Sequence, residues 1–453
     1  MSEEIILQYI EKKRDEFIEY FREMVKTDSY NPPGNELNLA NTISQYLKEH
    51  NIDVQIFEYD ENRANLIAFL NDNFKQKNLL FNGHMDIVPA GTESDWKYPP
   101  LSAYNKRNKY IYGRGAADMK GGLTAMVISL QILKELDLEI EGNLILTAVS
   151  DEETGGKKGT KWVLENKLAD IKCDFAIVGE PTGLSPLPKA IVLGERGHLQ
   201  LKIIAHGISC HASMPSMGKN AILMVNELLH KLDQIDSKIP EIEPPISFVE
   251  LKDLIAEAFP SKDIFENIYQ QQELLQHLVE SLTKFTKSVT MIGGGIKENV
   301  VPDRCEMVID FRLLPKQDPN QILNALKGLI KDLGYEFKEP EEEKADAYFT
   351  FEIIHKSEGS YWENWKDSDT LKQFYDIVGK IYERDSFYIL YPACADAHYL
   401  RNNGFCSDTI LFGPGSASTA HSVDEYIEIE DFINAIKTYT LFAYNFLKPQ
   451  QNQ

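Results

Sequence analysis

Three acidic residues stand side by side directly after an apolar segment of the chain. The segment LILTAVS, residues 144–150, has the composition of a buried strand, and Asp151, Glu152 and Glu153 follow it at once. Carboxylates gathered at a strand end repel one another, and burial raises their pKa values unless a cation or strong hydrogen-bond donors compensate. The sequence therefore predicts a bound cation at this point.

Other residues that can bind metal also follow apolar segments. His84 and Asp86 come after LLFNG, and Glu180 comes after FAIVG. His421 follows ILFGPG closely, and Asp118 lies in the glycine-rich segment GRGAADMKGG. In an open α/β sheet, ligand sites form outside the carboxyl ends of the strands, so we expect these side chains to meet in one crevice. Imidazoles and carboxylates without cysteine suit Zn²⁺, with Mn²⁺ and Co²⁺ as competitors, and a bridging carboxylate would let them hold two ions.

Each of these residues also has a plainer interpretation. His84 could be a hydrogen-bonded core histidine, Asp118 could cap the helix that follows it, and Glu180 could belong to an ordinary turn in GEPTG. His398 in ADAHYL competes with His421 as a ligand, but it lies in a helix-like stretch. The arrival of several such residues at strand ends favours the metal centre.

The elements that would position these residues follow an α/β pattern at both ends of the chain. Residues 1 to about 190 alternate helical patterns with short apolar segments, which is typical of a largely parallel sheet. The predicted strands there are residues 65–70, 78–88, 142–150 and 173–179. The same texture returns after residue 358, with a helix at 369–383, a strand at 408–415 and a terminal helix within 424–447.

The middle of the chain has a different order of elements. From Gly197 onward the pattern predicts β-α-β-β-α-β, the split βαβ arrangement of a small open-faced sandwich. His198 and His206 alternate on its first strand and are predicted to be ordinary sheet residues. An acidic, helical stretch near residues 235–285 interrupts this order as an insertion of no evident purpose. We therefore predict one α/β domain from residues 1–195 and 358–453, with residues 196–357 inserted as a second domain.

Bulk composition narrows the classes of partner and compartment. The 453 residues include 47 basic and 70 acidic side chains, a formal charge of -23 that disfavours nucleic acid and anionic membrane surfaces as partners. The five cysteines are scattered, without a C-x-x-C pair, which favours a reducing compartment over a disulfide framework. The first residues lack the pattern of a signal peptide, and no apolar run is long enough to span a bilayer. We expect a cytoplasmic location.

Several ordered motifs resemble the metallo-aminoacylase and carboxypeptidase family M20, which includes acetylornithine deacetylase and succinyl-diaminopimelate desuccinylase. The resemblance covers essentially the whole chain through GHMDIVP, GRGAADMKGG, DEETGG, GEPTG, HGISCHASMPSMGKNA, NVVPDRCEMVIDFR and GPGSASTAHSVDEY. It implies a zinc-peptidase-like catalytic domain with a mostly parallel sheet, and an inserted ferredoxin-like domain that serves as lid and dimerisation domain.

The resemblance also implies roles for individual residues. Asp118 would bridge two zinc ions, with His84 and Glu180 completing the shell of one ion. Glu153 and His421 would complete the shell of the other. Glu152 would be the general base that takes a proton from water, and Asp86 would orient His84. Because neighbouring side chains point apart in extended chain, Glu152 and Glu153 can hold different roles.

In the middle domain the resemblance places His211 near the carbonyl oxygen of the substrate, in the active site of the other subunit of a homodimer. Asn299 and Arg312 match positions that bind substrate, and a guanidinium group suits a carboxylate. We therefore expect a dinuclear zinc amidohydrolase that cleaves an N-acyl amino acid. A carboxypeptidase or dipeptidase acting on short peptides is the alternative within the family, and a catalytically silent binding protein is the alternative outside enzymes.

Overall fold

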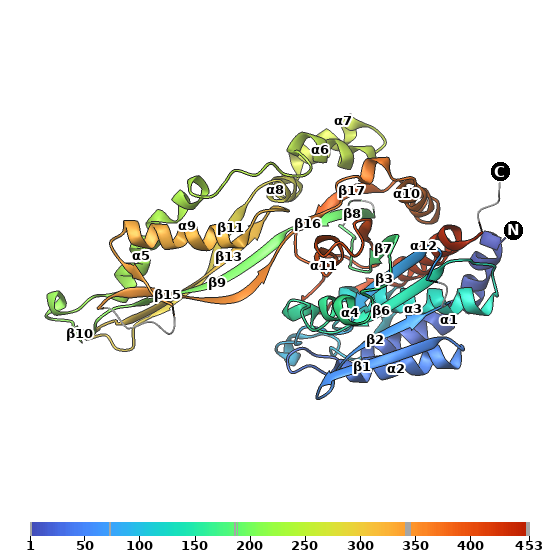
Figure 1. Ribbon diagram of the computed structural model, residues 1–453, viewed down its shortest axis with the longest axis horizontal. Coiled ribbons are helices and arrows are strands. Elements are labelled where there is room, and N and C mark those ends of the chain that lie inside the picture. Colours follow the sequence, from blue (N-terminus) through green and yellow to red (C-terminus); the bar gives the residue numbers. More distant parts are fainter. Residues whose placement is uncertain (1, 72–73, 185–186, 188, 340–345, 450–453) are drawn as a thin grey trace.

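The computed structural model describes residues 2–449 except 72–73, 185–186, 188 and 340–345. Figure 1 shows a larger part of helices around a sheet, here called the body, and an elongated part that projects from it, here called the arm. Both chain termini lie at the end of the body away from the arm. The body is built from both ends of the chain, and the arm from its middle.

The body contains a mixed sheet with the order β1-β2-β6-β3-β7-β18-β8-β16, and β17 also pairs with β8. Its central strands β6, β3, β7 and β18 are parallel, whereas β1, β2 and β16 pair antiparallel at the edges. The strands are β1 (Asp53–Asp60), β2 (Arg63–Phe69), β3 (Asn78–His84), β6 (Asn143–Val149), β7 (Phe175–Val178), β8 (Ala190–Glu195), β16 (Ser360–Tyr361), β17 (Phe387–Tyr391) and β18 (Thr409–Leu411). Every residue of β3, β6 and β7 is buried, which explains their nearly continuous apolar sequence.

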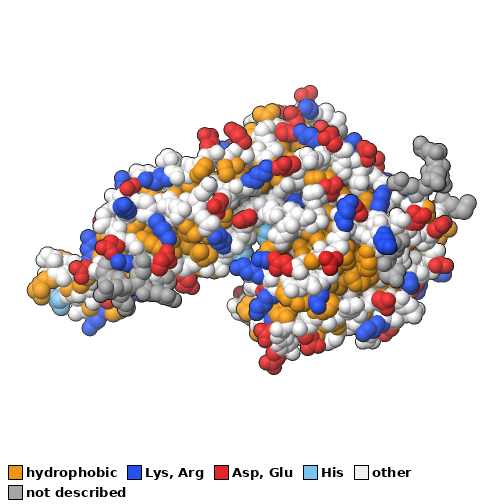
Figure 2. Space-filling model, in the orientation of Figure 1, with side chains coloured by type: hydrophobic (Ala, Val, Ile, Leu, Met, Phe, Trp, Pro, Cys, Tyr) orange, Lys and Arg blue, Asp and Glu red, His pale blue; other side chains and the backbone are white. Residues whose placement is uncertain are grey.

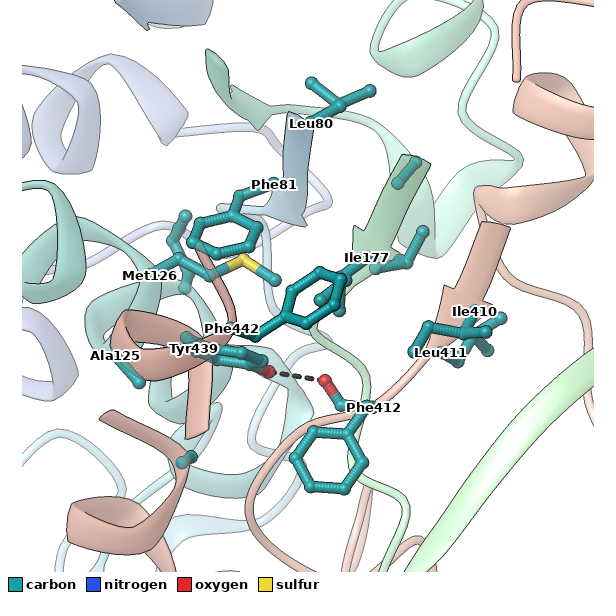
Figure 3. Packing of buried hydrophobic residues seen from close by; sticks show 14 of the residues in the cluster. Leu80, Phe81, Ala125, Met126, Ile177, Ile410, Leu411, Phe412, Tyr439 and Phe442 are labelled. Carbon is teal, nitrogen blue, oxygen red and sulfur yellow. Dashed lines mark hydrogen bonds between the residues drawn. The ribbon is translucent and has the colours of Figure 1, made fainter. Parts of the chain in front are cut away.

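Helices cover both faces of this sheet. One face carries α1 (Ser2–Lys26), α2 (Glu36–Glu49), α3 (Gly121–Glu135), α10 (Asp369–Tyr382) and α12 (Ile429–Leu447), and the other carries α4 (Thr160–Asn166) and α11 (Ala397–Asn402). Figure 3 shows α12 against the central strands, where the Tyr439 hydroxyl donates a hydrogen bond to the carbonyl of Phe412. The central strands are therefore held in a closed apolar layer, and their carboxyl ends are the part left free to carry polar side chains.

The arm contains a second sheet with the order β11-β13-β9-β15-β14. Helices α5 and α9 cover one face over a separate apolar cluster, and the opposite face carries no arm helix among the described residues. The elements are β9 (Gly197–His206), α5 (Ala221–Lys231), β11 (Thr286–Gly294), β13 (Arg304–Leu313), α9 (Pro319–Asp332), β14 (Glu336–Phe337) and β15 (Tyr348–Ser357). Apart from the short β14, this is the predicted β-α-β-β-α-β order.

The acidic stretch that interrupts this order forms three helices, α6 (Phe248–Glu257), α7 (Lys262–Gln271) and α8 (Glu273–Leu282). Their buried apolar residues, among them Leu251, Ile255 and Phe265, belong to the apolar cluster of the body rather than that of the arm. Figure 1 shows α6 near β17 and α10 at the top of the body, and α6 contacts β17. These helices thus lie within the predicted second domain in sequence but pack with the first one in space.

Two small sheets complete the described residues. One joins β4 (Tyr104–Lys106), β5 (Tyr110–Tyr112) and β19 (Tyr426–Glu428) in the order β19-β5-β4, and it ties the glycine-rich segment to the C-terminal part of the chain. The other pairs β10 (Cys210–His211) with β12 (Val300–Val301) at the far tip of the arm. Within the described ranges, every helix is too short or too polar to cross a membrane.

Candidate metal centre and cavity

One group of possible metal ligands joins the ends of two parallel strands, β3 and β7. His84 is the last residue of β3, and Glu180 follows β7 by two residues. The His84 Nε2 atom lies 3.1 Å from Asp118 Oδ1 and 3.8 Å from Glu180 Oε1. These three residues, here called the His84 group, place one ligand atom each within 4.8 Å of the others.

A second group uses the other oxygen of Asp118. The His421 Nε2 atom lies 3.1 Å from Glu153 Oε2 and 3.3 Å from Asp118 Oδ2. Asp118, Glu153 and His421, here called the His421 group, meet the same distance criterion. Asp118 therefore belongs to both groups and directs one carboxylate oxygen toward each histidine.

The electrostatics of these groups fit divalent cations. Burial raises the pKa values of Glu180 and Glu153. Burial disfavours the charged form of Asp118 as well, but hydrogen bonds from His421 and His84 lower its pKa overall. Hydrogen bonds to Asp118 and Glu153 raise the pKa of His421 to about 10. Glu180 Oε1 is buried and accepts no hydrogen bond from any described residue. Crowded carboxylates beside imidazoles, with one oxygen unpaired, are the donors that a divalent metal requires.

Asp86 connects the two halves of the candidate centre. The His84 Nδ1–H donates to the main-chain oxygen of Asp86 at 2.9 Å, whereas the carboxylate oxygen lies 3.6 Å from Nδ1. The carboxylate instead accepts hydrogen bonds from the main-chain N–H groups of Glu152 and Glu153, each at 3.2 Å. Asn31 donates to it at 2.8 Å. Asp86 therefore orients His84 through its backbone and fixes the acidic turn through its side chain.

Beside these groups lies a cavity of about 450 Å³ between the body and the base of the arm, within the size range of small-molecule sites. Figure 2 shows the hollow that separates the two parts of the molecule. The body lines it with Asp118, Glu152, Glu153, Thr154, Gly155, Glu180, Tyr391, Ala393, Cys394, Ala395, Asp396, His398 and His421, and the arm with His198, Gln200, Arg312, Ile354, His355 and Ser357. Four of the five candidate ligands, Asp118, Glu153, Glu180 and His421, therefore face the same space as the candidate base Glu152, whereas His84 lies buried behind them.

The wall that the arm contributes is polar. Asp310 accepts hydrogen bonds from Arg312 Nε at 2.8 Å and from His198 Nε2 at 2.8 Å, so it holds both side chains in place. His355 stacks on His198, and burial together with the nearby His198 and Arg312 lowers the pKa of His355 to about 4. The prediction that His198 is an ordinary sheet residue is wrong, because its side chain lines the cavity. His206 instead stacks on Tyr348 away from the cavity.

Two predicted residues lie far from this cavity within the same chain. His211 is on β10, and Asn299 immediately precedes β12, at the tip of the arm. The Ala212 N–H donates to the carbonyl of Asn299 at 3.0 Å, so the two segments are joined. The chain therefore brings His211 and Asn299 close to each other but not to the metal ligands. Their placement in the active site of a partner subunit stays a prediction.

The histidine that competed with His421 has another role. His398 lines the cavity, but its Nδ1–H donates to the main-chain oxygen of Ala395 at 2.7 Å, and it belongs to neither ligand group. The sequence analysis did not predict three residues that contact the ligand segments: Asn31, Arg114 and Glu425. A single sequence offers no signal for them, because their contacts depend on segments that are distant in the chain.

Comparisons with known proteins agree with this geometry. Residues 80–445 match the model of peptidase family M20/M25/M40. A probable succinyl-diaminopimelate desuccinylase of Staphylococcus aureus (strain N315) is 28% identical over 435 residues, covering 96% of this chain and 98% of that protein.

Two solved structures share the fold over nearly the whole chain. The M20 family metallo-carboxypeptidase Sso-CP2 from Sulfolobus solfataricus has a TM-score of 0.75 at 23% identity, covering 95% of this chain and 98% of its own. The dipeptidase Dug1p from Saccharomyces cerevisiae has a TM-score of 0.77 at 16% identity, covering 99% of both chains. The matched family model spans most of the sequence and includes every candidate metal ligand, so the protein belongs to peptidase family M20/M25/M40.

Proposed function

We propose that this hydrolase binds two Zn²⁺ ions and cleaves the amide bond of N-acyl amino acids, in the manner of acetylornithine deacetylase and succinyl-diaminopimelate desuccinylase. The observation that carries the proposal is the sharing of Asp118 between the His84 and His421 groups at the wall of one cavity. The 28% identity to a probable desuccinylase supports the choice of acyl group. Co²⁺ or Mn²⁺ could occupy the same donors.

The chain would hold one ion with His84, Asp118 and Glu180 and the other with Asp118, Glu153 and His421. Bound divalent cations acidify water and stabilise negative charge that develops on the oxygen of the amide carbonyl. Glu152 lines the cavity without belonging to either ligand group, and burial raises its pKa well above the ordinary value. Its carboxylate takes a proton from the attacking water and passes it to the nitrogen of the leaving amine. Asp86 holds the turn that carries Glu152 through the hydrogen bond to its N–H.

Recognition of the substrate would use the polar wall of the arm. Arg312 faces the cavity while Asp310 holds its Nε and Nη2 atoms, which leaves Nη1 to bind a substrate carboxylate. We therefore propose a substrate with an amide bond beside a free carboxylate, which is the structure of an N-acyl amino acid or a short peptide.

Assembly as a homodimer through the arm would complete the site. Strand β11 is an edge strand with exposed apolar residues, including Met291 at 67% and Ile292 at 57% exposure, and Leu223 on α5 is also 57% exposed. An apolar edge of this kind favours pairing with a second chain. The tip of the arm would then supply His211 to the metal centre of the partner, with Asn299 beside it. The scattered, unpaired cysteines support a cytoplasmic location.

A metal-dependent carboxypeptidase or dipeptidase is the second candidate, because the solved structures of a carboxypeptidase and a dipeptidase share this fold over nearly the whole chain. Acetyl, succinyl and aminoacyl amides with the same amino acid, assayed for the free amine, separate the two. We expect cleavage of the acetyl or succinyl amides. Cleavage of the peptides alone would refute the deacylase proposal.

The metal centre itself is tested by elemental analysis and chelation. We expect two zinc equivalents per chain, loss of hydrolysis on treatment with a chelator, and recovery on adding Zn²⁺. A reconstituted protein without bound metal, whose hydrolysis survives chelation, would refute the mechanism for every substrate.

A further inference from the structure

A buried ion pair lies directly behind the two ligand groups. Arg114, 3% exposed, donates from Nη1 to Glu425 Oε2 at 2.7 Å, and Glu425 is fully buried. Arg114 belongs to the glycine-rich segment before Asp118, and Glu425 immediately precedes β19. The pair therefore joins two segments, and each of these segments carries one candidate metal ligand.

Glu425 holds the backbone that presents Asp118. Its Oε1 atom accepts hydrogen bonds from the N–H of Ala117 at 2.9 Å and the N–H of Asp118 at 3.1 Å. The carboxylate of Glu425 thus fixes the main chain at Asp118, the ligand that the two groups share.

Arg114 holds the backbone that presents His421. Its Nη2 atom donates to the carbonyl of His421 at 3.3 Å, and its Nη1 atom donates to the carbonyl of Ser422 at 3.2 Å. His421 has a positive φ of 60°, a left-handed conformation that a residue other than glycine keeps only when its surroundings impose it. The guanidinium is part of those surroundings, because it binds the carbonyl of His421 and the carbonyl of the residue that follows it.

We propose that Arg114 and Glu425 are positioning residues that set the separation of Asp118 and His421, and thereby the affinity of the His421 group for its metal ion. This inference rests on the proposed metal binding but not on any substrate. A buried ion pair is a poor device for stability alone, because the desolvation of both charges offsets their attraction. Two aligned charges with five hydrogen bonds to the ligand segments and to each other are instead suited to fixing a geometry.

The effect should differ between the two ligand groups. In the His421 group the pair contacts the backbone of two ligands, Asp118 and His421. In the His84 group it contacts the backbone of Asp118 alone, because His84 is placed by β3 and Glu180 follows β7. Loss of the ion pair should therefore weaken binding of the ion in the His421 group strongly, and binding of the ion in the His84 group much less.

The test measures metal binding by the full-length protein, with Zn²⁺ or Co²⁺ alone as the probe and no substrate present. Equilibrium dialysis of wild type, Glu425→Gln and Arg114→Lys gives the affinity of the protein for each ion. The visible absorption of bound Co²⁺ reports the coordination of the ion in the His421 group. We expect the ion of the His421 group to lose about 10- to 100-fold in affinity in both variants, as is common when a partner of a metal ligand is removed. The ion of the His84 group should change only a few-fold.

A second buried pair in the body provides a matched control. Arg401 Nη1 lies 3.6 Å from Glu195, both side chains are buried, and neither contacts a candidate ligand. Glu195→Gln removes the same charge from a comparable environment, so it should lower thermal stability without changing the affinity of either ion. Equal loss of metal in Glu195→Gln and Glu425→Gln would reduce the effect to general destabilisation and overturn the proposal.

The remaining outcomes are also distinct. Two ions bound by Glu425→Gln as tightly as by wild type would refute the positioning role while leaving the proposed function intact. A wild-type protein that binds no pair of ions would refute the proposed function instead. If Glu425→Gln does not fold, Arg114→Lys carries the test, because a lysine keeps the charge opposite Glu425 but cannot reach both carbonyls at once.

Discussion

At the scale of residues, Glu152 and Glu153 are neighbours on one turn but are suited to different roles. Both residues are partly buried, and the main-chain N–H of each donates a hydrogen bond to the Asp86 carboxylate, yet only Glu153 joins a ligand group. Glu152 is left facing the cavity, which is the arrangement expected of a proton carrier.

Replacement of Glu152 by Ala should therefore separate catalysis from metal binding. We expect kcat to fall by about 10² to 10⁴, the usual contribution of a general base, with metal content unchanged. Steady-state assays and elemental analysis of the same preparation provide the measurement. Glu165→Gln, on an exposed position of α4, is the control. Full turnover by Glu152→Ala would show that another group is the base.

His355 predicts a specific dependence of stability on pH. Its pKa is lowered from 6.5 to about 4 by burial and by the nearby His198 and Arg312, so the unfolded chain binds a proton at this residue at a higher pH than the folded chain does. The free energy of unfolding should fall as the pH drops from 6.5 toward 4, by at most about 1.4 kcal/mol per pH unit from this group.

The variant His355→Gln isolates this contribution. Between pH 6.5 and 4 the metal-free wild type should lose more stability than metal-free His355→Gln, and above pH 7 their difference should be constant. Urea denaturation at several pH values measures it. Parallel pH profiles for the two proteins would show that His355 titrates normally in the folded state.

The sequence indicated which candidate ligands lie together but not the residues that support them, for a physical reason. A ligand at the end of a buried strand is visible from the local pattern, as with His84 after LLFNG. The acceptor of the His84 Nδ1–H depends instead on the backbone path after the strand, which made the main-chain oxygen of Asp86 the partner rather than its carboxylate. His198 was missed because alternation on a strand does not tell which face meets another domain.

At the scale of elements, the strands and helices agree with their patterns, whereas the placement of the insertion does not follow from its sequence. Buried parallel strands such as β3 and β6 are easily recognised as apolar runs. The sequence pattern of α6 and α7 shows that each helix has an apolar face, but it does not show whether the arm or the body covers that face. That choice is decided by tertiary packing, and the body covers it.

The packing of α6 gives a test with an internal control. Ile255 is fully buried in the cluster of the body, whereas Val249 on the same helix is 68% exposed. Ile255→Ala should lower the free energy of unfolding by about 2–5 kcal/mol, and Val249→Ala should change it by less than about 0.5 kcal/mol. Denaturant unfolding measures both. Equal, small effects would show that α6 does not pack against the body.

At the scale of the whole molecule, the distance between the arm tip and the candidate metal centre bears on the proposed homodimer. A single chain holds His211 and Asn299 at one end and the ligands at the other (Figure 1). In a symmetric dimer each arm can serve the body of its partner, since both chains carry the same complementary surfaces.

Mixing two inactive variants tests this arrangement. His211→Ala keeps an intact metal centre, and Glu152→Ala keeps an intact arm tip, so a mixed dimer would contain one complete site. We expect co-expressed variants to regain partial activity that neither has alone. If the mixed dimers, isolated by two different affinity tags, are as inactive as the parents, His211 does not act across subunits.

The interleaved order of the body has a consequence for synthesis on the ribosome. Strand β18, made near the end of translation, lies between β7 and β8, which are made long before it. A nascent chain that has emerged as far as the end of the arm therefore contains His84, Asp118 and Glu180. It still lacks His421 and the strand β18 that separates β7 from β8 in the main sheet. In the proposed dinuclear centre, the His84 group is therefore complete before translation ends, whereas the His421 group is complete only after the C-terminal segment has been made.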